Sequence, residues 1–228
     1  MRELFVRLSE FLGIYPAMMK LDTKIQMRKQ NRAFMKYGLA ALREAEAAAD
    51  EAGCRLFLAF GSLLGAYREK GFIPFDCDLD TGMLASERSD CFVQAMQRHG
   101  LTLLRQYYVK ETGRICEDKY DYKGVHLDVH FFYPSSDNTI CCELCLPHES
   151  KSWRDANATD GFPAIVRTVP ASTFSKQVFL GLHVFLPDNT EAWLKTLYGE
   201  HFMTPDPKWS MGDHKKRSVI SSERLYRR

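Results

Sequence analysis

The sequence predicts an α+β fold in which a β-sheet is flanked by helices and preceded by N-terminal helices. Three observations support this prediction: a long helical pattern near the N-terminus, a short apolar run directly after it, and three consecutive β-type runs in the middle of the chain. The 228 residues are 45% hydrophobic and 26% charged, as is ordinary for one large globular domain. We expect an amphipathic helix over residues 1–22, the main domain over 23–207 and a basic tail over 208–228.

Two helical patterns open the chain. In the first, apolar residues recur at helical spacing from Leu4 to Tyr15, and Pro16 is expected to end that helix. Docking on the domain is the default interpretation of its apolar face, and contact with a membrane surface or a partner is the alternative. The second helix is predicted over residues 23–52, where one stripe is apolar and Gly53 follows as the C-terminal signal.

The middle of the chain alternates short apolar runs with turn signals. Residues 54–60 are almost wholly apolar and predict a buried strand, after which Ser62 is the expected N-cap of a helix over 63–69. An antiparallel meander is predicted from β-type runs at 101–109, 114–120 and 125–133. Two further strands are expected, at 78–83 and 140–146. Two further helices are expected, at 86–99 with Ser86 as its N-cap and at 189–198. A surface loop is expected at 147–163, and an extended segment after Pro205.

Composition and charge argue against several classes of protein. A net charge of +2 gives no case for nucleic-acid binding, and no stretch approaches about 20 consecutive apolar residues, so we expect no spanning helix. Charged residues interrupt the first fifteen positions, which argues against a signal peptide. Seven scattered cysteines favour reduced thiols in a cytoplasmic compartment. Basic segments at 20–36 and between 214 and 228 are interpreted as solvated surface, with attraction to anionic lipid or a phosphorylated acceptor as the alternative.

The strongest chemical signal lies in residues 57–83. A Gly-Ser turn, Gly61-Ser62, follows the apolar run, and Asp78 and Asp80 stand two positions apart in a later short strand. Side chains at i and i+2 of a strand point to the same face, with Cα atoms roughly 7 Å apart, so the two carboxylates converge on one hard cation such as Mg²⁺. Asp-x-Asp pairs also occur in surface loops, but in a largely apolar run such a pair needs a cation to relieve its repulsion.

Further polar groups are spaced to bind a phosphate-bearing substrate. The Gly-Ser turn offers free backbone N–H groups at a helix start, and Arg68 and Lys70 follow one or two helical turns later. Asp128 is the expected third carboxylate, on the polar face of a strand that also carries His126 and His130, which are interpreted as polar-face residues rather than ligands. Three carboxylates beside a phosphate-binding turn favour phosphoryl transfer, which depends on charge neutralisation and positioning.

These residues resemble the LicD/fukutin-related family of the nucleotidyltransferase-fold superfamily. The similar segments are Gly61-Ser62-Leu-Leu-Gly65, Arg68, Lys70-Gly-Phe-Ile-Pro74, Asp76-x-Asp78-x-Asp80, and the later segments 127–131, 184–188, 194–199 and 203–207. Two residues depart from the family pattern: Phe75 replaces a usual Trp, and Cys77 replaces an Asp of many members. By strand parity Cys77 faces away from the flanking aspartates, so we expect it to pack rather than to bind metal.

The resemblance implies a nucleotidyltransferase-like mixed β-sheet and a metal-dependent transferase. Such proteins move phosphocholine, ribitol phosphate or glycerol phosphate from a CDP-linked donor to a glycan hydroxyl, with release of CMP, in capsule, lipopolysaccharide or other glycoconjugate biosynthesis. The residues implied as catalytic and as ligands of Mg²⁺ or Mn²⁺ are Asp78, Asp80 and Asp128, with Asp128 also implied as acceptor of the hydroxyl proton. The implied substrate-binding residues are Gly61, Ser62, Arg68, Lys70 and Asp76.

Two other hypotheses about function stay open. The same fold also serves nucleotidyltransferases that move a nucleoside monophosphate, and a catalytically idle homologue would bind nucleotide or glycan or scaffold an assembly complex. For the leading hypothesis we expect a cytoplasmic enzyme, peripheral at the inner membrane face, whose glycan acceptor is soluble or lipid-linked. No nucleic-acid partner is expected.

Two groups of residues have both a structural and a functional interpretation. Structural zinc is one interpretation of Cys116, Cys141, Cys142, Cys145 and His148. Adjacent cysteines on a strand point to opposite faces, which favours buried thiols instead. A cation–π cage for choline is one interpretation of Tyr107, Tyr108, Tyr120 and Tyr122, and packing within the meander is the other.

Overall fold

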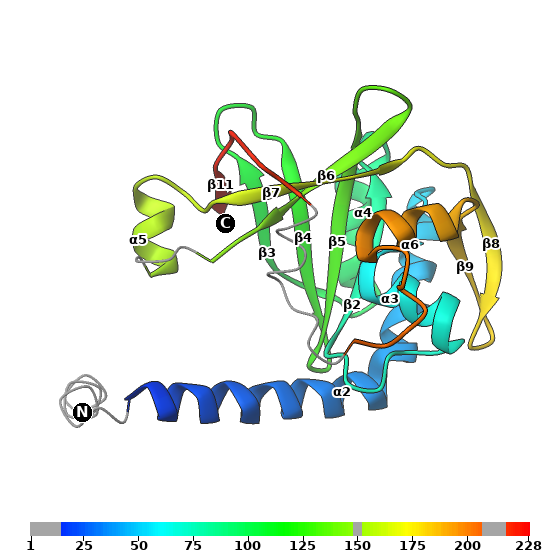
Figure 1. Ribbon diagram of the computed structural model, residues 1–228, viewed down its shortest axis with the longest axis horizontal. Coiled ribbons are helices and arrows are strands. Elements are labelled where there is room, and N and C mark those ends of the chain that lie inside the picture. The colour runs from blue at the N-terminus through cyan, green and yellow to red at the C-terminus, as the bar shows by residue number, and fades with distance from the viewer. Residues whose placement is uncertain (1–14, 148–151, 207–217) are drawn as a thin grey trace.

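The computed structural model describes residues 15–147, 152–206 and 218–228, with side chains from residue 25 onward. Its centre is a mixed β-sheet flanked by helices, which confirms the predicted α+β class (Figure 1). The helices are α2 (Tyr15–Ala52), α3 (Phe60–Leu64), α4 (Asp90–Arg98), α5 (Trp153–Ala158) and α6 (Thr190–Tyr198), with a π-helical turn at Gly65–Glu69 and a 3₁₀ turn at Ala85–Glu87.

The sheet is organised around one central strand, β5. The strands are β1 (Phe57–Leu58), β2 (Asp78–Leu84), β3 (Thr102–Val109), β4 (Ile115–Tyr122), β5 (Val125–Pro134), β6 (Thr139–Cys145), β7 (Ala164–Pro170), β8 (Phe174–Phe179), β9 (Leu182–Pro187), β10 (Val219–Ile220) and β11 (Leu225–Arg227). β5 pairs in parallel with β2 and antiparallel with β4, and its last two residues pair with β6. Strands border β5 on both sides, and its polar side chains Asp128 and His130 are buried.

Strands β3, β4 and β5 form the predicted antiparallel meander, and β6 confirms the strand expected at 140–146. The β4–β5 connection has Lys123 and Gly124 at φ 52° and 86°, the positive values that a type I′ hairpin turn requires at both central positions. Tyr122 therefore lies opposite Val125, and this fixes every later pair along the two strands.

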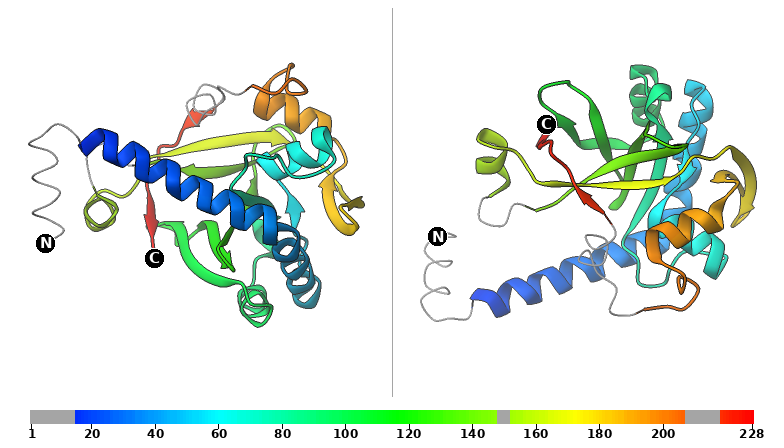
Figure 2. Two further views of the ribbon diagram at one scale, coloured as in Figure 1. Left: turned by 90° about the horizontal axis from the view of Figure 1, so that it is seen from below. Right: turned by 45° about the horizontal axis from the view of Figure 1, so that its top comes forward.

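Helix α2 packs a face of small and apolar residues against the sheet. Phe34, Ala41 and Ala45 are buried on that face, and the alanines let the helix approach β2 and β5 closely. The other part of this helix, its N-terminal turns, extends away from the strands in Figure 1 and in the right view of Figure 2. None of the described helices combines the length and apolar character needed to cross a membrane.

The start of α2 differs from the prediction. The helix begins at Tyr15 rather than residue 23, and Pro16 lies in its first turn instead of ending a preceding helix. Proline is tolerated there because the first N–H groups of a helix have no intrahelical acceptor. The helix expected before Tyr15 falls on residues 1–14, which lie outside the described residues.

Both predicted serine N-caps are wrong. Helix α3 starts at Phe60, so Ser62 lies inside it. The helix expected from residue 86 starts at Asp90, and its N-cap is Ser89, whose Oγ accepts a hydrogen bond from Phe92 N at 3.2 Å. At α3 the N-cap is Ala59, which makes no side-chain cap, because the helix starts two residues before Ser62. At α4 the sequence offers both Ser86 and Ser89 near the boundary, and the 3₁₀ turn at Ala85–Glu87 leaves Ser89 as the cap.

The C-terminal third holds more regular structure than expected. The loop predicted at 147–163 contains α5, and strands β7, β8 and β9 follow where no strand was predicted from the sequence. Of the segment after Pro205, residues 207–217 lie outside the described residues, and in the described part β10 pairs with β7 and β11 pairs with β3. These strands are short or carry exposed polar side chains, as β8 does at 175–177, so their apolar pattern is weak.

Glu46 makes the stability of this fold depend on pH. The residue is 8% exposed on α2, and its Oε1 has no hydrogen-bond partner among the described residues. Burial, and secondarily the charge of Asp50, raises its pKa to about 8. The folded state therefore keeps a proton that the unfolded chain releases near pH 4.3, so stability is fully present below that pH and falls until about pH 8.

We expect Glu46→Gln to stabilise the protein by about 2 kcal/mol at about pH 9 and to change little at about pH 5. Urea unfolding at the two pH values measures the difference. Glu191→Gln is the control, because Glu191 is exposed on α6. An equal effect of Glu46→Gln at both pH values would contradict the assignment.

Candidate active site

A pocket of about 860 Å³ opens where α3, β2, β4 and β5 meet. The loop before β2 and the segment after α6 complete its walls. Of the residues singled out in the sequence, the pocket is lined by Gly61, Arg68, Asp76, Asp78, Asp80 and Asp128. Ser62 and Lys70 are not part of its lining. The structure therefore brings the three predicted aspartates together from two separate strands.

The parallel pairing of β2 and β5 sets the centre of the pocket. Asp80 lies directly opposite Asp128 in the register of the two strands, and Asp78 lies opposite His126. Because side chains alternate along a strand, Asp78, Asp80 and Asp128 point to the same side of the sheet. The predicted convergence of carboxylates depends on this register, since a shift by one residue would turn Asp128 to the opposite face.

The first turn of α3 holds Asp80 in place. Gly61 N donates to Asp80 Oδ2 at 3.0 Å, and Asp80 N donates to Ser62 Oγ at 2.9 Å. Ser62 is buried, so the structure shows its hydroxyl fixing the β2 backbone from outside the pocket. Phe60 starts α3 with φ 38°, a value in which a bulky side chain is strained, and such strain is common where backbone is held for function.

Three ligand-type side chains lie close enough to share one cation. Atoms of Asp80, Asp128 and His130 all lie within 4.8 Å of one another. Asp128 Oδ1 is buried without a hydrogen-bond partner among the described residues, which is costly unless a further group binds it. Two carboxylates and an imidazole are suitable ligands for a divalent cation, and the nitrogen favours a metal such as Mn²⁺ that accepts it. The residues present therefore fit a divalent metal.

His130 belongs to this group, although the sequence pattern predicts a polar-face residue rather than a ligand. It is buried, with Nε2 3.7 Å from Asp80 Oδ1 and Nδ1 3.9 Å from Glu117 Oε2. Both distances are longer than a hydrogen bond, and Nδ1 has no hydrogen-bond partner among the described residues, so the two carboxylates act on the ring through their charge. The signal was present in the sequence, because His130 follows Asp128 by two positions and so shares its face of β5.

Lys119 is a second residue of the site that was not predicted from the sequence. Its Nζ lies 2.7 Å from Asp128 Oδ2, and both side chains are about 10% exposed. Burial opposes the ammonium charge, but Asp128 and Glu117 more than offset it and raise the pKa of Lys119. The type I′ turn at 123–124 pairs residue 119 with residue 128, so the hairpin signal in the sequence contained this contact.

Negative charge accumulates in the pocket and shifts the acidic groups toward their neutral forms. Burial first, and then the charge of Asp80, raises the pKa of Asp76 to about 6 and that of Asp78 to about 8. Burial and the charge of Asp128 raise the pKa of Glu117 to about 7. Perturbed groups of this kind gather at functional sites, where a bound cation removes their repulsion.

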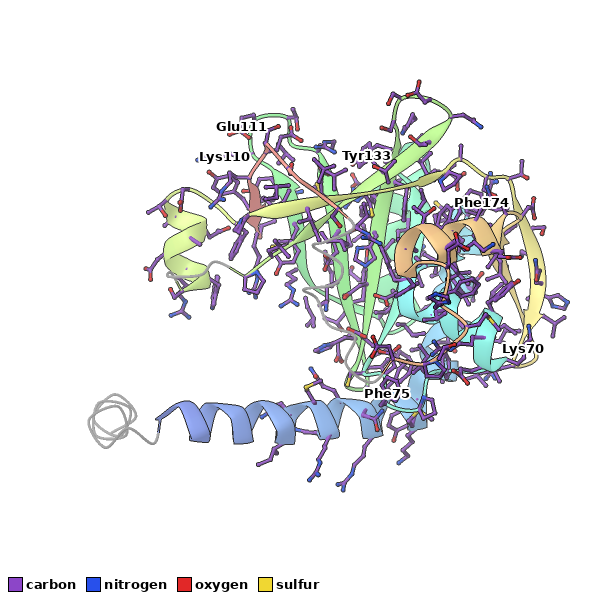
Figure 3. All side chains as sticks on the ribbon, in the orientation of Figure 1. Lys70, Phe75, Lys110, Glu111, Tyr133 and Phe174 are labelled. Atoms are coloured by element: carbon purple, nitrogen blue, oxygen red, sulfur yellow. The ribbon has the colours of Figure 1, made fainter. Side chains whose placement is uncertain are left out.

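The predicted cationic residues separate in the structure. Arg68 lines the pocket, and its guanidinium donates from Nη1 to Phe202 O at 3.0 Å, which ties the segment after α6 to the pocket wall. Lys70 lines a different pocket beside α6, and Figure 3 shows it well away from Phe75, which lies next to α2. The structure therefore does not bring Lys70 together with the three aspartates.

The remaining residues of the motif lie at the pocket rim. Asp76 accepts a hydrogen bond from Cys77 N at 3.0 Å, and its backbone carbonyl accepts one from Asn31 Nδ2 at 2.6 Å. Cys77 is outside the pocket lining, with Sγ 3.5 Å from Met27 O. Helix α2 therefore holds the loop that carries Asp76.

The tyrosines and cysteines take mixed positions. Tyr107 lines the pocket, whereas Tyr120 is buried against Phe92. Cys142 is buried, and the Cys116 thiol lies 3.2 Å from a carboxylate oxygen of Glu143. All seven cysteines are free. The four tyrosines do not form one cage.

Gly61 is a position where the pocket needs glycine. A Cβ there would lie 2.9 Å from Asp76 Oδ2 and 3.1 Å from Asp80 Oδ2. We expect Gly61→Ala to push these carboxylates aside and to lower turnover roughly tenfold to a hundredfold, with little change in Tm. The rate of product release measures the change in turnover, and thermal unfolding measures the change in Tm. Gly71→Ala is the matched control, because an added Cβ there meets only Glu69 O at 3.9 Å.

Comparison with known proteins agrees with this geometry. The family described as "LicD/FKTN/FKRP, nucleotidyltransferase domain" matches residues 53–189, which include the Gly-Ser turn and all three aspartates. The ribitol-5-phosphate transferase FKTN of Homo sapiens is 25% identical over 182 residues, covering 78% of this chain and 35% of the relative. The protein of the same name from Mus musculus is 24% identical over 177 residues, covering 77% of this chain and 35% of the relative. The chain thus spans about a third of the length of these relatives. It belongs to the LicD/FKTN/FKRP nucleotidyltransferase family.

Proposed function

We propose that this protein transfers a phospho-alcohol from a CDP-linked donor to a glycan hydroxyl and releases CMP. The observation that carries the proposal is the β2–β5 register, which places Asp80 opposite Asp128 in a pocket of about 860 Å³. A pocket of that volume has the size of a nucleotide-type ligand site. The family indicates a transferase, and relatives bear the name ribitol-5-phosphate transferase. Ribitol phosphate is therefore the first group to test, followed by glycerol phosphate and phosphocholine.

Four residues of the pocket are proposed to hold Mg²⁺ or Mn²⁺: Asp78, Asp80, Asp128 and His130. When bound, the cation supplies charge neutralisation for the phosphate oxygens of the donor. Gly61 fixes Asp80 through its backbone N–H, and Ser62 fixes the strand that carries Asp80. Arg68 and Asp76 are proposed to contact the substrate from the pocket wall.

The transfer itself makes one bond and breaks one bond. The acceptor oxygen bonds to the phosphorus of the transferred group, and the bond from that phosphorus to the oxygen of CMP breaks. The hydroxyl proton must leave the acceptor, and Asp128, which lines the pocket from β5, is the proposed base. Positioning and charge neutralisation contribute most of the rate in such reactions.

A panel of donors tests the proposal. The protein is incubated with Mg²⁺ or Mn²⁺, candidate glycan acceptors, and CDP-ribitol, CDP-glycerol, CDP-choline or CTP. Release of CMP with a matching gain in acceptor mass supports the proposal. Pyrophosphate from CTP would instead identify a nucleotidyltransferase. Binding of a nucleotide without turnover across the panel would identify an idle homologue. Surface-polysaccharide or other glycoconjugate biosynthesis is the proposed context.

A further inference from the structure

Helix α2 carries an exposed basic face that the proposed chemistry does not use. Residues 23–43 contain no aspartate or glutamate, while five exposed cations follow one another along the described part of this helix. They are Arg28, Lys29, Arg32, Lys36 and Arg43. No carboxylate of the described residues forms an ion pair with any of them, so this basic face is uncompensated. It stands out in a chain whose net charge is only +2.

Helical geometry places these cations together. At about 100° per residue, the five cations and two apolar side chains, Ile25 and Met35, fall within an arc of about 120°. Both apolar side chains are 52% exposed. The buried residues Phe34, Ala41 and Ala45 lie on the opposite side, against the sheet. Side chains along α2 extend away from the domain in Figure 3. The outer face of α2 is therefore both basic and apolar.

We infer that this outer face of α2 binds an anionic lipid surface. An interfacial helix combines Lys and Arg, which attract anionic headgroups, with apolar side chains that enter the boundary of the acyl chains. The exposed aliphatic residues among the cations favour lipid over a nucleic acid, whose phosphate backbone offers them no apolar contact. They also favour lipid over a second copy of the chain, because two uncompensated basic faces repel each other.

Bound in this way, α2 would lie between the lipid surface and the pocket. Asn31 Nδ2 donates to Pro74 O at 3.0 Å and to Asp76 O at 2.6 Å, so α2 carries the pocket-rim loop directly. Phe75 in that loop is 69% exposed. A helix is about 10–12 Å across, so the rim stands about one helix diameter above the surface. If the proposed transfer holds, this height suits a glycan acceptor anchored in the same membrane.

Vesicle binding tests the inference without donor or metal. The full chain is sedimented with phosphatidylcholine vesicles that contain or lack phosphatidylglycerol. We expect binding only to the anionic vesicles, weakened by salt. The triple variant Arg28→Gln/Lys29→Gln/Arg32→Gln is expected to bind about a hundredfold more weakly. Ile25→Ser/Met35→Ser is expected to retain attraction at low salt but to lose binding near physiological salt.

A triple variant of matched charge is the control. Lys110→Gln/Arg154→Gln/Lys176→Gln removes the same charge from exposed positions outside α2, and it should keep the affinity within a few-fold. Equal loss in both triple variants would overturn the inference, as would wild-type protein that ignores anionic vesicles. Binding of an RNA oligonucleotide as tight as that of vesicles, and lost in the α2 triple variant, would also overturn it. Turnover of a soluble acceptor should be unchanged in the α2 triple variant. A failure of the lipid-binding inference can therefore be distinguished from a failure of the proposed transfer reaction.

Discussion

Replacing Asp80 by Asn is expected to lower transfer at least about a thousandfold. Asp80 is the one carboxylate that lies opposite Asp128, lies within 4.8 Å of His130 and is held by Gly61 N. The amide oxygen of Asn can still accept from Gly61 N, so the backbone should keep its place. The negative charge that a divalent cation needs is lost. Single-turnover release of CMP measures the rate, and calorimetric titration with Mn²⁺ measures the lost affinity.

The same substitution should not destabilise the metal-free protein. The substitution removes one of several carboxylates that repel one another. This repulsion is visible at Asp78, because burial and then the charge of Asp80 raise the pKa of Asp78 to about 8. An equal or higher Tm in the presence of EDTA therefore separates lost chemistry from lost folding. Asp50→Asn is the control, because Asp50 is exposed on α2 and pairs only with Lys176 among the described residues. If Asp80→Asn retained a tenth of the activity, the site assignment would be wrong.

Local pattern was sufficient to place the two aspartates of β2 on one face. It also located the meander, because each strand of that region is bounded by a clear turn signal. The parity rule put Asp78 and Asp80 on the same side, and the polar face of the run at 125–133 indicated Asp128 as the third carboxylate, which the family resemblance also implied. The step that local pattern does not supply is the parallel β2–β5 register, which joins residues from separate parts of the chain.

The residues missed at the site share one physical cause. His130 and Lys119 are polar groups whose roles depend on burial and on neighbours across strands. A histidine on a polar face looks the same in sequence whether it meets solvent or a carboxylate. Lys70 was expected in the site because it follows Arg68 closely, but the π-helical turn and the left-handed conformation of Lys70 itself, at φ 54°, carry it to the α6 side. Spacing along a chain predicts a position only while the helix stays regular.

The second large effect concerns Lys119. We expect Lys119→Met to destabilise the metal-free protein by about 3–5 kcal/mol, because it leaves Asp128 buried and uncompensated beside other carboxylates. Saturating Mg²⁺ or Mn²⁺ should restore much of that loss, since the cation takes over the charge that Lys119 neutralised. Urea unfolding in EDTA and with added metal measures both effects.

Arg88→Met is the matched control for this metal dependence. Arg88 pairs with Asp118, the residue next to Lys119 on β4, at 3.2 Å, and Asp118 is fully buried. Removal of the Arg88 guanidinium should also destabilise the protein. Because Asp118 lies outside the pocket lining, added metal should restore none of the lost free energy of unfolding. If the two variants responded alike to metal, Lys119 would be a structural cation only. A selective response of Lys119→Met would mean that the fold stabilises its acidic centre with a built-in cation, and that a bound metal shares this task.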